Sequence, residues 1–324
     1  MMSRQIVAAA VSGPLGVCLA VLGVLSIGIG EASALDRHIV NAKGFAPPDF
    51  TTTFLGTGQL EGQVNPVGFG QAISPGQWLR PLGTQTGTGV VQSTVFSPTV
   101  LSGDVANTQA VKIDRINNSP DRWGIPVNNQ GYPEYPGPNA NGEPLQPCIC
   151  INWDMRVEGP AGVPGDFPDG DFGPYFGVEA NDDDVSGIKL LGSLGVDATT
   201  AEVLYQAPGS GDLTPAGPVT VFGTWHNYQI KLDYSTHDYT IYYDQFPLGT
   251  FAFVDGQNDQ FSEANILALA ASGAPADLVR AGTAFFDNFL VQEGGCNVVP
   301  EPTSVVLILM GLMGVPYVAR RQRG

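Results

Sequence analysis

The stretch WHNYQIKLDYSTHDYTIYYD, residues 225–244, decides the fold class of this chain. Polar and apolar residues alternate along its first half, which is the pattern of a strand with one buried face. The apolar face of this first strand consists of Tyr228, Ile230, Leu232 and Tyr234. Ser-Thr-His-Asp at 235–238 predicts a turn, after which the returning strand continues the same face with Tyr239, Ile241 and Tyr243. The stretch therefore predicts an antiparallel hairpin.

Shorter apolar pieces broken by Gly and Pro surround this hairpin. They predict strands over residues 89–96, 110–116, 150–157, 175–180, 189–194, 251–254 and 283–291. One helix is predicted, over residues 262–271, with Ser262 as its cap. The chain holds 42 Gly and 26 Pro, and only 14% of its residues are charged. Short strands and tight turns without alternating helices predict an all-β protein of two antiparallel sheets packed face to face.

The composition also suggests where the domain begins and ends. Residues 35–55 contain a Pro-Pro step and predict an irregular lead-in, and residues 56–294 predict one β-sandwich domain. Within that domain, residues 117–147 are rich in Asn, Pro, Gly and Tyr and predict a long surface loop. The formal charge of −17 excludes nucleic acid as an expected partner, because phosphate binding needs basic residues.

The C-terminal segment has three consecutive parts. Pro300, Glu301 and Pro302 end a linker over residues 295–302, and an uncharged apolar run follows over residues 303–319. The chain then ends with a basic tip that contains Arg320, Arg321 and Arg323. About 17 apolar residues are at the lower limit of what spans a bilayer, and clustered arginines favour the cytoplasmic side. Residues 303–324 therefore predict a transmembrane helix with an Arg-rich tail that holds the preceding domain outside.

The N-terminal segment agrees with this topology. Arg4 precedes a long apolar region, and Ala32-Ser33-Ala34 fits a small-x-small cleavage site. Residues 1–34 therefore predict a secretory signal peptide, with an uncleaved anchor as the alternative. We expect the domain to be exported to the cell envelope or cell surface.

The Pro-Glu-Pro triplet, apolar helix and Arg-rich end together resemble the PEP-CTERM sorting signal of Gram-negative bacteria. This resemblance covers about the last 26 residues. It implies an exosortase-type processing enzyme as a partner, transient anchoring in the inner membrane, and a recognition role for the triplet. The alternative is an ordinary tail anchor with a chance triplet.

A second resemblance concerns the domain. The 225–244 hairpin and the late Phe286-Asp287-Asn288-Phe289 are similar to concanavalin A-like (laminin G-like) jelly rolls. The resemblance implies a jelly-roll sandwich, sugar binding and, in many members, calcium. This chain departs from the family pattern after Asp244, where Gln245-Phe246-Pro247 intervene before Gly249.

Oxygen-bearing side chains suggest where calcium would bind. They follow a predicted strand as Glu179, Asn181, Asp182, Asp183 and Asp184, and a second acidic loop holds Asp166, Asp169 and Asp171. Hard cations take six to eight oxygen ligands, so this group predicts a calcium site. Neither loop has the spacing of an EF-hand, and the alternative is a solvated acidic turn.

Aromatic residues suggest a surface on which sugar rings could stack. The candidates are Trp123, Tyr132 and Tyr135 in the long loop and Tyr242 on the outer face of the hairpin. The alternative is that these side chains anchor the loop on the sandwich. Asp154 and Arg156 share one strand face, where an ion pair across strands is more plausible than glycoside hydrolysis.

Three cysteines remain beyond the predicted signal: Cys148, Cys150 and Cys296. Cys148 and Cys150 are too close along an extended strand to pair comfortably with each other. One of them could therefore pair with Cys296. The leading hypothesis is an exported, non-catalytic protein that binds or scaffolds extracellular polysaccharide. Calcium-dependent carbohydrate binding is one form of this hypothesis. The alternatives are a glycoside hydrolase or lyase of concanavalin A-like fold and a purely structural coat protein.

Overall fold

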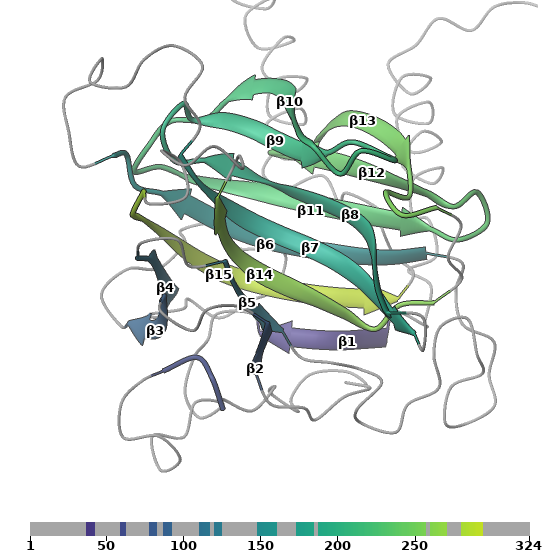
Figure 1. The fold of residues 1–324 in the computed structure, drawn as a ribbon, viewed down its shortest axis with the longest axis horizontal. Helices are drawn as coiled ribbons and strands as arrows, with labels where there is room; N and C mark the ends of the chain where they lie inside the picture. The colour runs from purple at the N-terminus through teal and green to yellow at the C-terminus, as the bar shows by residue number, and fades with distance from the viewer. Residues whose placement is uncertain are drawn as a thin grey trace, which may run out of the picture. The chain divides into compact units, whose positions relative to one another are not determined.

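A computed structural model of the chain describes residues 37–42, 59–62, 78–82, 87–92, 110–116, 120–124, 148–160, 173–184, 187–256, 260–270 and 280–293. This part of the chain contains strands, turns and irregular segments but no helix. The strands form two antiparallel sheets that lie face to face, with β7, β8 and β14 in front of β6, β11 and β15 in Figure 1. The predicted all-β, jelly-roll sandwich is confirmed.

The first sheet has eight strands. In spatial order they are β13 (Phe246–Ala252), β12 (Asp238–Tyr243), β11 (Trp225–Asp233), β6 (Cys148–Val157), β15 (Gly282–Glu293), β4 (Ala110–Arg115) and β3 (Thr88–Gln92), and β1 (Arg37–Ala42) pairs with β15.

The second sheet has seven strands. In spatial order they are β10 (Leu213–Val219), β9 (Glu202–Gln206), β8 (Gly187–Asp197), β7 (Pro174–Asp184), β14 (Glu263–Ala270), β5 (Asp121–Gly124) and β2 (Leu79–Leu82).

The predicted hairpin forms two neighbouring strands of the first sheet, between β13 and β6. β11 pairs with β12 from Tyr228↔Tyr243 to Asp233↔Asp238, and its other edge pairs with β6. Its predicted apolar face packs into the core between the sheets, where Tyr228 stacks on Trp153 of β6 with ring centroids 5.8 Å apart. The sheets approach closely where Gly192 of β8 lies under Tyr239, because a Cβ at that glycine would come within 2.7 Å of the ring. The alternation of residues 225–244 therefore predicted the core correctly.

The helix predicted over residues 262–271 is wrong. Glu263–Ala270 form β14, which pairs with β7 on one side and with β5 on the other. Ala264, Ile266 and Ala268 point into the core, as expected for a strand with period two. Ala and Leu favour helices in isolation, but pairing with two neighbouring strands overrides that preference.

Two segments predicted as irregular also contain strands. β1 lies within the predicted lead-in and pairs with the end of β15. β5 lies within the predicted long loop and pairs with β14 and β2. Neither strand is evident in the sequence, because each is short and lies among polar residues. Each pairs with a strand that already belongs to a sheet.

The strands run between two ends of the sandwich, which we name after the first and last residues of β15. At the Gly282 end, β15 begins beside Val157 of β6, and β8 ends at Asp197. At the Glu293 end, β15 finishes beside Ile149 of β6.

The terminal predictions lie outside the described residues. They are the signal peptide of residues 1–34 and the transmembrane helix and tail of residues 303–324. Within the described ranges, no helix is long and apolar enough to cross a membrane.

Candidate functional site

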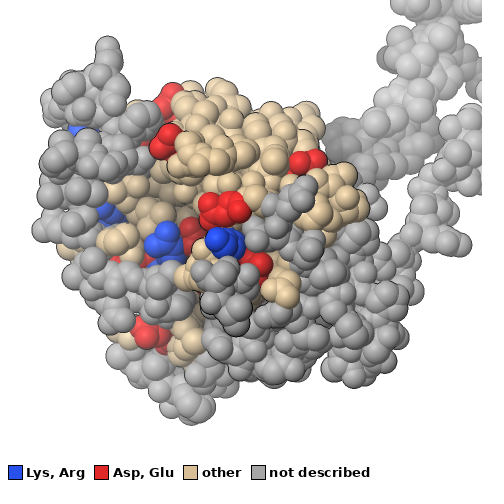
Figure 2. Space-filling model, turned by 45° about the vertical axis from the view of Figure 1, so that its right-hand side comes forward, with Lys and Arg blue, Asp and Glu red and all other residues tan. Residues whose placement is uncertain are grey.

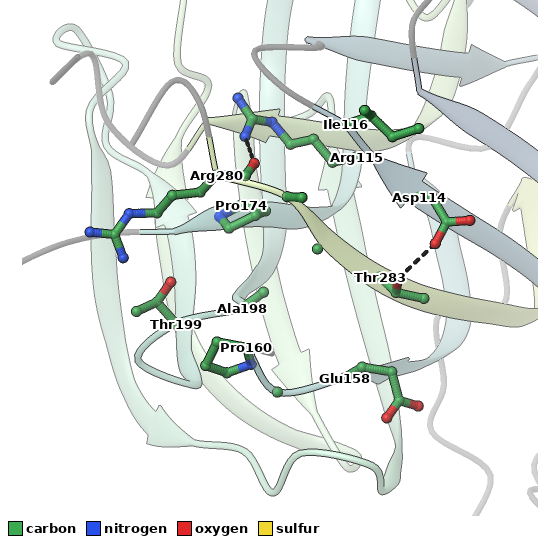
Figure 3. A pocket seen from close by; sticks show the side chains of 13 residues that line it. Asp114, Arg115, Ile116, Glu158, Pro160, Pro174, Ala198, Thr199, Arg280 and Thr283 are labelled. Carbon is green, nitrogen blue, oxygen red and sulfur yellow. Dashed lines mark hydrogen bonds between the residues drawn. The ribbon is translucent and has the colours of Figure 1, made fainter. Parts of the chain in front are cut away.

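A pocket of about 520 Å³ opens at the Gly282 end of the sandwich. Its lining comes from both sheets: the end of β4, the start of β15 and the residues after β6 face the start of β7 and the residues after β8. Four small residues of the lining, which we call the floor, are Pro160, Pro174, Ala198 and Gly282. Figure 3 shows charged and hydroxyl side chains around this floor. The volume lies in the range of small-molecule sites.

One side of the pocket is built around Asp114, at the end of β4. Its Oδ1 accepts a hydrogen bond of 2.6 Å from the Thr283 hydroxyl, and its Oδ2 lies 2.8 Å from the Lys112 ammonium. Thr88 Oγ1 donates a further bond of 3.3 Å. The ion pair and the hydroxyl bonds fix the carboxylate on this side of the pocket (Figure 3).

The opposite side holds Arg280 and Thr199 (Figure 3). The carbonyl oxygen of Arg280 accepts a hydrogen bond from the guanidinium of Arg115, which is 1% exposed. Arg115 therefore holds the backbone that leads into β15, whereas the Arg280 side chain extends along the rim. One cavity is thus bordered by the guanidinium groups of Arg115 and Arg280 and by the carboxylates of Asp114 and Glu158.

Asp197 fixes the turn that carries Thr199. Its carboxylate accepts backbone hydrogen bonds from Thr199 at 2.6 Å, from Thr200 at 2.8 Å and from Gly173 at 2.9 Å. Burial raises the pKa of this carboxyl, and the three N–H donors oppose that rise without cancelling it. The bonds join the start of β7 to the end of β8, so the second sheet presents a fixed edge to the pocket.

Glu158 lies at the end of β6, 2.7 Å from the guanidinium of Arg156. That guanidinium also lies over the ring of Phe285, 5.5 Å from its centroid. The prediction of a surface ion pair across strands on this face is wrong for Asp154, which does not lie at the surface. Asp154 is completely buried, and two asparagine side chains donate to it: Asn227 at 2.8 Å and Asn288 at 2.7 Å.

These contacts define the chemistry that the pocket can perform. An apolar floor can pack against the C–H face of a ligand, while carboxylate, hydroxyl and guanidinium groups on the rim can bind polar substituents. Both carboxylates are already engaged by a cation, Asp114 by Lys112 and Glu158 by Arg156. They are therefore fixed hydrogen-bond acceptors, which suits recognition of hydroxyl groups.

A second polar cluster near this end involves His226, at the start of β11. Its Nδ1 lies 2.8 Å from Asp244 Oδ2 and 2.9 Å from the Tyr243 hydroxyl. Burial disfavours ionisation of Asp244, but hydrogen bonds from His226 and from the Asn227 backbone outweigh it and lower the pKa of this carboxyl. An imidazole relay needs one partner at each ring nitrogen. Both partners here use Nδ1, and the buried Nε2 has no hydrogen-bond partner among the described residues. The cluster therefore fastens β11 to the turn after β12.

The predicted calcium ligands lie along β7, and alternation separates them. Glu179 lies on the outer face of its sheet, where its Oε1 accepts from Arg122 at 2.6 Å and from the Asn181 amide at 3.1 Å. In Figure 2, Lys and Arg atoms lie among Asp and Glu atoms near the middle of the face in view. Glu179 thus already has a cationic partner, and Asn181 presents its nitrogen to it.

The structure describes few of the remaining predicted ligands. The side chains of Asp183 and Asp184 lie outside the described set, as do Asp166, Asp169 and Asp171. Within the described ranges, no group of three or more His, Cys, Asp and Glu side chains is placed to hold a metal ion. The calcium site stays a prediction.

The predicted sugar platform is wrong for Trp123. This side chain is 1% exposed and belongs to the core, because β5 inserts it between the sheets. Tyr242 is partly exposed on the outer face of β12, as predicted. Tyr132 and Tyr135 lie outside the described residues.

The structure places two of the three cysteines at the Glu293 end. Cys150 forms a disulfide, whereas Cys148, two residues earlier on β6, does not. Cys296 lies outside the described residues, as do Pro300, Glu301, Pro302, Arg320, Arg321 and Arg323. The disulfide at Cys150 agrees with the expectation that either Cys148 or Cys150 is bridged, and Cys296 as its partner stays a prediction.

Sequence reasoning did not find the residues of the pocket. Asp114, Glu158, Thr199 and Arg280 come from four separate segments, and each stands at the end of a strand or in a turn. No spacing or motif links them, because the jelly-roll topology brings them together. The sequence signal that could have indicated the pocket is the clustering of charged residues at the ends of strands.

Comparison with known proteins gives structural similarity only. No protein-family model matches the chain, and no curated protein matches its sequence significantly. An endo-β-1,4-glucuronan lyase from the fungus Trichoderma reesei aligns over 68% of this chain and 99% of its own, at 10% identity and a TM-score of 0.43. Alginate lyase A1-II′ in complex with product aligns over 57% and 80%, at 9% identity and a TM-score of 0.40. A sialidase aligns over 63% of this chain, at 11% identity and a TM-score of 0.38, and the match covers 16% of the sialidase chain.

Proposed function

We propose that this protein is an exported cell-envelope protein that binds polysaccharide without catalysis, and that the pocket at the Gly282 end is its binding site. One observation carries the proposal: the pocket combines an apolar floor with fixed acceptors and guanidinium donors. Sugar rings have apolar C–H faces and hydroxyl groups around their edge, so this arrangement is complementary to them.

The position of the pocket supports this proposal. β15, the last described strand before the predicted membrane helix of residues 303–324, finishes at the Glu293 end. The pocket lies at the other end of the strands, among residues such as Gly282 and Glu158. During anchoring by the predicted tail, the pocket would therefore face away from the membrane, toward the extracellular matrix.

A glycan array followed by titration calorimetry tests the binding function. We expect Arg280→Ala to weaken binding about tenfold, because it removes a charged donor from the rim. Its carbonyl group, which Arg115 contacts, would remain. The control is Lys189→Ala, which removes a cation from β8 near the Glu293 end. Failure of the wild-type protein to bind any polysaccharide, with or without calcium, would overturn the proposal.

The sorting proposal has a separate test. We expect replacement of both Pro300 and Pro302 by Ala to stop processing, so that the longer form accumulates in membranes of cells that contain the exosortase. Replacement of Pro316 by Ala is the control, since it changes a proline within the apolar run and leaves the triplet intact. Unchanged processing and surface delivery of the double variant would show that the triplet is not recognised.

One observation favours a second candidate, a polysaccharide lyase. The Tyr243 hydroxyl lies 2.9 Å from His226 Nδ1, and a hydroxyl–imidazole pair can serve as acid and base in β-elimination. Elimination from a polyuronate produces a C=C bond that absorbs ultraviolet light. A lyase would show this absorbance with wild-type protein and lose it in Tyr243→Phe. No absorbance with any polyuronate would exclude this activity.

A further inference from the structure

We propose that the binding site extends beyond the pocket, across the β10–β11 loop, to an exposed apolar patch formed by Val219, Val221 and Phe246. The protein would then bind the interior of a sugar chain over several units rather than a single terminal unit. This inference rests on the function proposed above, because it takes the pocket as one end of the extended site.

The three patch residues are the most exposed large apolar side chains of the described residues. Val219 is 62% exposed, Val221 63% and Phe246 72%, whereas Leu79, Ile116 and Ile188 range from 38% to 45%. A hydrogen bond of 3.3 Å between the Tyr243 hydroxyl and Thr220 Oγ1 brings them together. Val219 and Val221 flank Thr220 in the chain, and Phe246 pairs with Tyr243 across the turn. This bond places the segment that carries Val219 and Val221 beside the turn that carries Phe246.

The loop of residues 220–224 joins this patch to the pocket. Its Phe222 lies against Gly159 of the pocket lining, where a Cβ would come within 3.1 Å of the ring. The Gly223 N–H donates a bond of 2.9 Å to the carbonyl of Val157, at the end of β6. The loop is thus fastened beside the pocket, and a ligand that leaves the pocket over Phe222 would meet Val221 next.

Charge and topology make a membrane an unsuitable occupant of this patch. The protein carries a formal charge of −17, which opposes approach to anionic lipid. Val219 ends β10 at the Gly282 end, whereas β15, the last described strand before the predicted membrane helix, finishes at the Glu293 end. The patch and the end of β15 therefore lie at opposite ends of the strands.

The edge strand β10 is also poorly suited to pairing with a second copy. β10 and β13 lie side by side at the upper edge of the sandwich in Figure 1. β10 contains Pro215, Gly217 and Pro218, and its ladder with β9 is interrupted between Pro215 and Val219. Proline removes a ladder donor and blocks continued pairing. A sugar chain needs no backbone ladder, and its C–H faces can pack on Phe246 and the valines.

Binding of short and long oligosaccharides tests this inference. The probes are cello-oligosaccharides and mannuronate oligosaccharides, each as dimer and hexamer, and calorimetry measures their affinity. We expect Phe246→Ala to weaken hexamer binding about tenfold and to leave dimer binding unchanged, because only the hexamer reaches the patch. Arg280→Ala should weaken both. The control is Ile188→Ala, an exposed apolar residue near the Glu293 end, which should change neither.

Each other outcome has a definite meaning. Unchanged hexamer binding by Phe246→Ala, or an equal loss for dimer and hexamer, would overturn the extended site while the pocket stands. Absence of wild-type binding to both series and to the array would overturn the proposed function itself. Sedimentation of a wild-type dimer that Phe246→Ala converts to a monomer would overturn the inference in favour of a self-interface. An unfolding temperature equal to that of the wild type ensures that the variant is folded.

Discussion

Asp154 of β6 lies directly opposite Asp287 of β15, and both side chains are completely buried. Like charges at such a position would repel, so the surrounding amides have to stabilise them. Asn227 donates to Asp154 Oδ1, and Asn288 donates to its Oδ2 through the side chain and to Asp287 through the backbone. The two aspartates lie beside a bulge in the pairing of β15 with β6. At this bulge Asn288 adopts a φ of 50° and bonds to both carboxylates.

Removal of Asp154 should destabilise the domain. Asp154→Ala would leave the side-chain amides of Asn227 and Asn288 buried without this acceptor, which we expect to lower the free energy of unfolding by about 2–4 kcal/mol. Denaturant unfolding measures the change. The control, Asp212→Ala, removes an exposed carboxylate and should change stability by less than about 0.5 kcal/mol. Equal effects of the two changes would contradict the role given to Asp154.

Truncation of Trp123 should act on folding rather than on sugar binding. The side chain is 1% exposed within the core, so Trp123→Ala should cost about 3–5 kcal/mol. Tyr242→Ala, on the partly exposed outer face of β12, should cost much less. Thermal unfolding of both variants checks this expectation. A nearly unchanged unfolding temperature of Trp123→Ala would contradict the burial of Trp123 in the core.

The fold could be predicted where a local pattern determines burial. The alternation of residues 225–244 was sufficient for the central hairpin, because each side chain faces the core or the outside according to its position alone. The same rule predicted β6 correctly but gave Asp154 the wrong environment. Asp154 is buried although Asn152 and Arg156 on the same face are partly exposed, and the pattern of one strand cannot show which of these positions its neighbours cover.

Other elements depend on partners that are distant in sequence. Residues 263–270 are a strand because β7 and β5 pair with them, which their Ala- and Leu-rich composition does not reveal. Trp123 is buried for the same reason. The pocket depends on the topology even more strongly, since Asp114, Glu158, Thr199 and Arg280 share no motif.

Asp244 should make the stability of the protein vary with pH. Its pKa is lowered in the folded protein, so the ionised carboxylate stabilises the fold above its unfolded pKa of about 3.9. That contribution is lost as the pH falls through the lower folded pKa. We expect wild type to unfold at a higher temperature than Asp244→Asn near neutral pH, and the difference to shrink at more acidic pH. A difference that grows toward acidic pH would contradict the lowered pKa, and Asp212→Asn is the matched control.

The turn after β12 stores strain that a single glycine should remove. Asp244 and Gln245 have φ angles of 47° and 70°, in the left-handed region that disfavours residues with a Cβ. Gln245→Gly should therefore stabilise the protein by about 0.5–1 kcal/mol, since the relief of strain exceeds the entropy lost by glycine on folding.

The neighbouring residue provides the comparison, because it has the same backbone conformation but a bonded side chain. Asp244 accepts from the Asn227 backbone at 2.9 Å and contacts His226 Nδ1 at 2.8 Å. Asp244→Gly relieves similar strain but loses both contacts, so we expect it to lower stability. Denaturant unfolding of the two variants separates the effects. If Gln245→Gly destabilised the protein as much as Asp244→Gly, contacts of the Gln245 side chain, rather than backbone strain, would determine the stability of this turn.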